Sequence, residues 1–228
     1  MKDEDGILAG MSWLGVICPV CGEALIETAR VLRCEQGHAF DVAREGYVNL
    51  LRWRGKPPKI VGDSAEMLRA RRRFLGKGWY APLVDLLADE VGGETAVLLD
   101  AGCGEGYYTR QMAGRWPQAR IWGMDIAKTA VRLAARQQPA ARFFAADVRQ
   151  QIPLETASVD VILNIFSPRN ADEFGRALRG DGRLLIIIPA PDHLGALRRQ
   201  FDLLTIEAGK QEKITTQMSR DFELVRVR

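Results

Sequence analysis

Residues 96–106 read Ala-Val-Leu-Leu-Asp-Ala-Gly-Cys-Gly-Glu-Gly, and this stretch decides the fold. An apolar run of strand length is followed at once by Gly102, Gly104 and Gly106. Glycines at the C-terminal end of a buried strand let the backbone pass close to a ligand. The next residues, 107–115, read as a helix. The stretch therefore predicts a strand, a ligand-binding turn and a helix in that order.

The same alternation of strand and helix continues downstream. Short apolar runs at 120–125, 142–147, 158–164 and 183–189 predict further strands, and residues 128–136 predict another helix. Buried parallel strands that are separated by helices are typical of a doubly wound sheet. We therefore expect an α/β protein with a Rossmann-like fold.

Acidic residues end three successive strands of the expected sheet. Asp100 precedes the glycine turn, Asp125 follows it by about twenty residues in the position that accepts ribose hydroxyls, and Asp147 ends the third strand. NAD enzymes use a similar turn, but with the spacing G-x-G-x-x-G. An edge this acidic does not suit a cofactor with phosphates. It favours S-adenosylmethionine (SAM), whose adenine amine, ribose and amino group all donate hydrogen bonds; an unrelated ligand on the same sheet is the alternative.

Two ligand pairs near the N-terminus predict a metal site. Cys18 and Cys21 form one pair, and Cys34 and His38 form the second after a gap of twelve residues. This set completes one tetrahedron around Zn²⁺, and metal binding would supply folding free energy to a segment too short to build a core. A disulfide or scattered core thiols are the alternatives, and a reducing compartment disfavours the first. We expect one structural zinc ion per chain.

The positive charge of the chain is concentrated in one block. The net charge is +3, yet residues 52–80 carry nine basic and two acidic side chains, whereas residues 1–51 carry four basic and eight acidic ones. The residues Gly62-Asp63-Ser64-x-Glu66 read as an N-cap followed by an acid in the first turn, so a helix is expected from there to Gly76, and a shorter one over 82–91. Four arginines of the first helix are candidates for contact with RNA phosphates: Arg69, Arg71, Arg72 and Arg73. The alternative is a solvated helix face.

Three segments follow from these patterns. We expect a zinc-binding domain over residues 1–52, a basic helical linker over 53–93 and a SAM-binding domain over 94–228. No apolar run reaches the roughly 18 residues that a membrane helix needs. The acidic N-terminus has no apolar segment behind it and does not resemble a signal peptide, so we expect a cytoplasmic protein without membrane contact.

Several motifs occur together in a fixed order: CPVC at 18–21, EGYVNLL at 45–51, GDSAEM at 62–67, LDAGCGEGYYT at 99–109 and FSP at 166–168. Over residues 15 to 200 the chain resembles the bacterial RlmA-type 23S rRNA guanine-N1 methyltransferases. The resemblance implies SAM-dependent methylation of N1 of one guanine in a 23S rRNA hairpin, and a homodimer. It also matches Tyr80, Gly104, Glu105 and His193 to positions where that family holds the cofactor.

Two other functions remain open on the sequence. A small-molecule methyltransferase would use the same fold, but it would need neither the zinc site nor the basic block. A non-catalytic RNA-binding or assembly protein could retain a SAM pocket. The final residues, 222–228, look like a sixth strand, and relatives continue beyond it into a hairpin partner. Without that partner an apolar sheet edge would be left unpaired.

The segment after the fourth strand is the candidate acceptor site. It reads Asn-Ile-Phe-Ser-Pro-Arg-Asn over 164–170, which differs from the Asn-Pro-Pro-aromatic motif of exocyclic-amine methyltransferases and favours a ring nitrogen. We expect Phe166 to stack on the target guanine and Asn164 to hydrogen-bond to its edge. The alternative for Phe166 is an ordinary core position. No side chain is evident as the general base.

Overall fold

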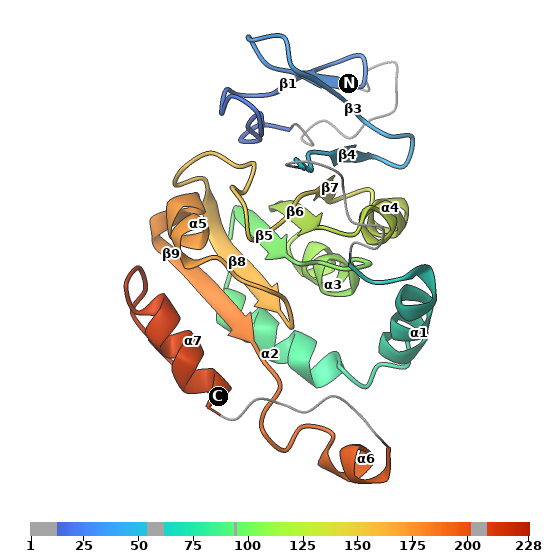
Figure 1. Cartoon of the computed structure of the whole chain (residues 1–228), viewed down its shortest axis with the longest axis vertical. Coiled ribbons are helices and arrows are strands. Elements are labelled where there is room, and N and C mark those ends of the chain that lie inside the picture. The colour runs from blue at the N-terminus through green and yellow to red at the C-terminus, as the bar shows by residue number, and fades with distance from the viewer. Residues whose placement is uncertain (1–12, 54–61, 94, 202–208) are drawn as a thin grey trace.

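The fold is described from a computed structural model, which covers residues 13–53, 62–93, 95–201 and 209–228. The acidic N-terminus and the basic residues within 54–61 lie outside the described residues. The central feature is a parallel sheet of six strands in the order β4-β7-β6-β5-β8-β9 (Figure 1). Its strands are β4 (Tyr47–Asn49), β5 (Val97–Ala101), β6 (Arg120–Asp125), β7 (Arg142–Ala145), β8 (Val159–Ile165) and β9 (Leu178–Ile187).

Side chains of the central strands alternate between two apolar cores, as the period of a strand requires. On β5, Leu99 belongs to one core and Leu98 to the other; on β7, Phe144 and Phe143 divide in the same way. Both faces of the sheet are therefore buried, which explains why these strands read as continuous apolar runs in the sequence.

Helices cover the two faces unequally. Residues of α2 (Ala81–Val91), α3 (Tyr107–Arg115) and α4 (Lys128–Gln137) build the core on one face. On the other face α5 (Ala171–Ala177) shares the core with residues of the N-terminal segment, where Trp13 packs against Trp122 at a ring-centroid distance of 5.8 Å. The remaining helices are α1 (Ala65–Leu75), α6 (Gly195–Gln200) and α7 (Lys210–Met218).

The N-terminal segment forms a small antiparallel sheet beyond the β4 edge (Figure 1). Its strands are β1 (Ile26–Thr28), β2 (Val31–Arg33) and β3 (Ala39–Asp41). The next strand, β4, pairs in parallel with β7 and so belongs to the large sheet. The segment 1–52, expected as a zinc-binding domain, thus supplies one edge strand of the large sheet and part of its core.

Most expected elements are present, with two differences. The strands and helices expected between 96 and 165 match β5 to β8, α3 and α4 within a few residues. Strand β9 begins at Leu178, earlier than expected, because Leu178 already pairs with Val159 of β8; the register then shifts before Val161 pairs with Arg183. The expected sixth strand at 222–228 was wrong: these residues have no regular structure, and Arg226 and Arg228 instead pair with Glu90 of α2.

None of the helices in the described ranges is long and apolar enough to cross a membrane.

Candidate functional site

A cavity of about 730 Å³ opens at the C-terminal ends of four parallel strands. The chain runs from β5 to β6 and β7 on one side and returns to β8 on the other, so the cavity lies at the switch point where open α/β sheets bind ligands. Its walls from the sheet are residues 102–105, 107–108, 124–126, 146–149 and 165–168, and further walls come from α1 and Tyr80. This volume suits a nucleoside-sized ligand.

At the glycine turn, the backbone that follows β5 lies against the loop that follows β8. Gly102 has a φ of +93°, and a Cβ atom built there would collide with the Ser167 side chain. Glycine alone fits this position, because any side chain would be strained in conformation and would displace the loop after β8. The predicted close approach of the backbone therefore exists, both to the cavity and to this loop.

Asp125 lies at the end of β6 and lines the cavity, as expected for a ribose-binding carboxylate. Its Oδ2 atom accepts a hydrogen bond from the Gly104 N–H at 2.9 Å, and its Oδ1 atom accepts one from the Ala127 N–H at 2.8 Å. Burial raises its pKa, and the two N–H groups lower it again. The carboxylate is thus fixed in orientation, with lone pairs left for further donors.

Asp147 also lines the cavity, but a second cavity-lining residue covers it. The Arg149 guanidinium donates to both carboxylate oxygens, from Nε and from Nη2, each at 2.9 Å. Asp147 is 8% exposed, whereas the Arg149 side chain is 63% exposed. A ligand amine could therefore reach Asp147 if the arginine moves outward.

Asp100 lies beneath the turn and is not part of the cavity wall. It is 1% exposed, and its Oδ2 atom accepts a hydrogen bond from the Thr109 hydroxyl at 2.6 Å. Burial raises its pKa to about 7, in spite of that hydrogen bond. In this structure Asp100 ties β5 to α3 below the glycine turn.

Glu105 provides the buried acceptor that a bound ligand could use. It lines the cavity and is 3% exposed, and its Oε2 atom has no hydrogen-bond partner among the described residues. Burial raises the pKa of the Glu105 carboxyl. The positive charges of Arg110 and Arg72 oppose this rise without cancelling it. An unpaired buried acceptor is costly unless a donor meets it. The amino group and hydroxyls of SAM supply such donors, so the site fits this cofactor.

Aromatic rings gather beside the cavity. Phe166 is 46% exposed and its ring lies 6.3 Å from that of Tyr80 and 6.4 Å from that of His193. The Tyr80 hydroxyl is 3.5 Å from the His193 Nε2 atom, and Phe74 packs edge-on against Tyr80. Phe166 and Tyr80 line the cavity, whereas His193 contacts both rings but is not part of the cavity wall. Phe166 is thus not a core residue.

Asn164 occupies a different place from the one expected. It is fully buried, and its Nδ2 atom donates to the Ala101 carbonyl at 3.2 Å and to the Pro168 carbonyl at 2.8 Å. Its side chain therefore faces the protein interior and fixes the loop that carries Phe166.

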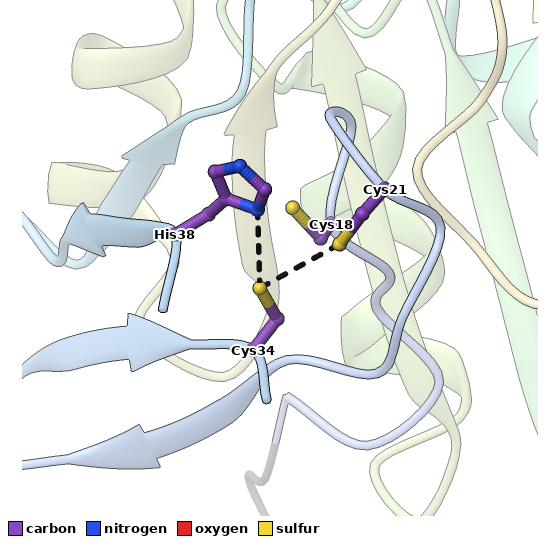
Figure 2. A group of neighbouring side chains, drawn as sticks. All are labelled: Cys18, Cys21, Cys34 and His38. Atoms are coloured by element: carbon purple, nitrogen blue, oxygen red, sulfur yellow. Dashed lines mark hydrogen bonds between the residues drawn. The ribbon is translucent and has the colours of Figure 1, made fainter. Parts of the chain in front are cut away.

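The four predicted metal ligands converge on one point (Figure 2). Their ligand atoms all lie within 4.8 Å of one another, with 3.6 Å between the sulfur atoms of Cys21 and Cys34 and 3.4 Å between the Cys34 sulfur and His38 Nδ1. Ligand atoms of a tetrahedral zinc site with Zn–S bonds of about 2.3 Å lie roughly 3.5–3.8 Å apart. The two distances are close to this range, so the set fits zinc, and its four ligands leave no open position for catalysis.

The basic helix α1 presents its arginines in two directions. Arg71 lines the cavity and pairs with Asp63, which also lines it. All four candidates are exposed, the Arg71 side chain to 44%, but Arg69, Arg72 and Arg73 do not line the cavity. The structure therefore separates Arg71 from the group with which the sequence placed it.

Comparison with known proteins accounts for both halves of the chain. Residues 16–57 match the zinc-ribbon model described as RlmA, N-terminal, and residues 98–185 match a methyltransferase domain. The 23S rRNA (guanine(748)-N(1))-methyltransferase of Streptomyces fradiae is 39% identical over 213 residues, which cover 91% of this chain and 75% of that protein. The chain belongs to the RlmA family of 23S rRNA (guanine-N1)-methyltransferases.

Two further likenesses cover only part of the chain. Trans-aconitate 2-methyltransferase of Afipia carboxidovorans is 36% identical over 129 residues, which cover 52% of this chain and 49% of that enzyme. A chain from the complex between the Haloferax volcanii Trm112 methyltransferase activator and a methyltransferase superposes with a TM-score of 0.50 at 16% identity, covering 65% of this chain and 72% of that one. The latter likeness confirms the fold alone.

Membership of the RlmA family confirms the two predicted cofactors, SAM and one structural zinc ion. Sequence reasoning gave no role to Ser167, although it lies in the FSP motif, and it missed Arg149, which lines the cavity without a motif of its own. For Arg71 a signal existed, since it falls on the same side of its helix as Leu68 and Leu75, the buried residues of α1.

Proposed function

We infer that this protein transfers the methyl group of SAM to N1 of a guanine in a 23S rRNA hairpin. The observation that carries this inference is that one cavity is lined both by residues 102–105 of the glycine turn and by the exposed aromatic ring of Phe166. Bound SAM supplies an electrophilic methyl group on a sulfonium centre. An rRNA substrate places the protein in the cytoplasm, and by family resemblance we expect a homodimer.

Cofactor binding follows from the fixed acceptors at the strand ends. We assign Asp125 to the ribose hydroxyls, because its carboxylate is oriented by two backbone N–H groups and faces the cavity. Asp147 takes the adenine amine after Arg149 has moved away. Gly102 and Gly104 keep the floor of the site open, and Glu105 offers its unpaired oxygen.

Three groups support the cofactor site from outside its wall. Asp100 holds the turn through Thr109, and His193 holds Tyr80 at the cavity edge. Asn164 holds the acceptor loop through two backbone carbonyls. We therefore propose these three as positioning residues, which act on the reaction through the groups they orient.

The acceptor base needs a surface outside its helix. Guanine N1 lies on the Watson–Crick edge and carries a proton, so the base must leave its stack and lose that proton before N1 can attack. Phe166 offers an exposed ring at the cavity, with a φ of +51° that a phenylalanine seldom adopts. A strained residue held at a ligand site is a common sign of function. We assign Phe166 to stacking on the flipped guanine.

The rest of the RNA contacts charged surface around the cavity. Arg69, Arg72 and Arg73 are exposed on α1 and are proposed to contact phosphates. Such contacts position the RNA without reading its sequence.

The decisive experiment is incubation with labelled SAM and unmodified 23S rRNA, followed by mapping of the methylated nucleotide. We expect one N1-methylguanine, and a loss of about 5- to 150-fold in turnover for Phe166→Ala, with Phe201→Ala as control because Phe201 is also an exposed aromatic residue. Base–aromatic stacking of about 1–3 kcal/mol sets this scale. Label on a small molecule and none on RNA would refute the proposal.

A further inference from the structure

Helix α1 has one buried edge, and Arg71 lies on it. Leu68 and Leu75 are the buried residues of the helix, and Arg71 falls between them at positions i+3 and i−4. At about 100° per residue, Arg69 and Arg73 point roughly 160° away from Arg71. The Arg71 side chain, which is 44% exposed, therefore lies along the side of α1 that faces the cavity, whereas Arg69 and Arg73 lie on the opposite side of the helix.

The Arg71 guanidinium lies directly over the glycine turn. A Cβ atom built on Gly104 would be 3.5 Å from the Arg71 Nη1 atom, which is ordinary van der Waals contact. Arg71 lines the same cavity as Gly104 and Asp125. Burial raises the pKa of Asp125, and the charge of Arg71 is among the groups that lower it. The guanidinium thus lies inside the cofactor site, within electrostatic reach of its main acceptor.

The charge balance of the cavity leaves Arg71 as the available cation. Its wall carries Asp63, Glu105, Asp125 and Asp147, and only Arg71 and Arg149 are positively charged among the described residues that line it. Arg149 is bound in bidentate fashion by Asp147. In the described part of the chain, Arg71 makes a single ion pair, from Nη1 to Asp63. A guanidinium has five N–H donors, so most of its capacity remains for an anion.

We propose that Arg71 binds the α-carboxylate of SAM and is not a phosphate contact of the RNA. The carboxylate is the one negatively charged group of SAM. Among the described residues that line this acidic cavity, the other cation, Arg149, is already bound in bidentate fashion by Asp147. Bidentate pairing with a guanidinium is the strong mode of carboxylate recognition. Asp63 keeps the side chain directed at the turn in the absence of ligand.

This inference rests on the SAM-dependent function proposed above, and its test uses cofactor binding alone. The dissociation constants of SAM and of decarboxylated SAM, which lacks only the carboxylate, are measured by calorimetry with the whole protein. We expect the native protein to prefer SAM by about ten- to a hundredfold, the scale of a charged hydrogen-bonded pair. Arg71→Gln should bind the two ligands equally, and Arg71→Lys should restore part of the preference.

The matched control is Arg73→Gln, which removes the same charge from the opposite side of the same helix. It should keep the full preference for SAM. If Arg71→Gln keeps the native preference, the inference is overturned while the proposed function stands. If the native protein binds neither ligand, the proposed function fails as well. If Arg71→Gln does not fold, the inference is decided by Arg71→Lys, in which an unchanged preference overturns it.

Discussion

Asp100 makes the stability of this protein depend on pH in an unusual direction. Its carboxyl is 1% exposed, and burial raises its pKa to about 7 although the Thr109 hydroxyl donates to it. In the unfolded chain the pKa of an aspartate is about 3.9. The folded protein therefore holds this proton more tightly than the unfolded chain does. The stabilisation is complete below about pH 4 and is lost as the pH rises towards 7.

The size of the effect follows from the shift. A displacement of about three pH units, at about 1.4 kcal/mol per unit, gives roughly 4 kcal/mol over the whole range. Between pH 5 and pH 8 the expected loss is about 2–3 kcal/mol. This is a large part of the total for a domain whose free energy of unfolding is on the order of 5–15 kcal/mol.

The test compares the native protein with Asp100→Asn. The amide cannot ionise, yet its oxygen can still accept the Thr109 hydrogen bond. Free energies of unfolding from urea titrations at pH 5, 6, 7 and 8 are subtracted between the two proteins, so that all other titrating groups cancel. The native protein should become less stable relative to the variant as the pH rises, by about 2–3 kcal/mol in all.

A difference that stays constant from pH 5 to pH 8 would refute the reasoning. Thr109→Val provides a second check, because it removes the hydroxyl that favours the ionised carboxyl. It should raise the pKa of Asp100 further and extend the pH-dependent loss of stability above pH 7.

Three further predictions concern the binding sites. Cys21→Ser should release the single zinc ion, measured by metal analysis, and should lower the Tm of the whole protein because the zinc segment shares a core with the large sheet; an unchanged metal content would contradict this. Asp125→Ala should weaken SAM binding about 30- to 150-fold by calorimetry, the scale of about 2–3 kcal/mol for charged hydrogen bonds, and tight NAD binding in place of SAM would reverse the cofactor assignment. Neutralising Arg69 and Arg73 together should lower the slope of log RNA affinity against log salt by about 1.4, at ~0.7 per phosphate contact, and an unchanged slope would give these arginines a structural role.

Features that are local in the chain were determined by the sequence itself. The spacing of Cys18, Cys21, Cys34 and His38 specified the zinc site, because each ligand pair converges through a short turn. The glycine turn, Asp125 and Asp147 were correctly expected at one edge of the sheet, because parallel strands bring their C-terminal ends together. The strands between 96 and 165 could be located from their continuous apolar runs, because a strand that is buried on both faces of a sheet carries apolar residues throughout. The helices were expected between them.

Features that depend on distant neighbours were decided only by the tertiary structure. From the sequence Asn164 is a polar residue of an acceptor loop. In the structure its side chain is buried, where it donates hydrogen bonds to the carbonyls of Ala101 and Pro168. Arg71 is one of three consecutive arginines. It lines the cavity because it lies on the same side of α1 as Leu68 and Leu75, which pack against the protein. Side-chain identity fixes what a residue can bind, whereas the packing of elements far apart in the chain fixes which partner it meets.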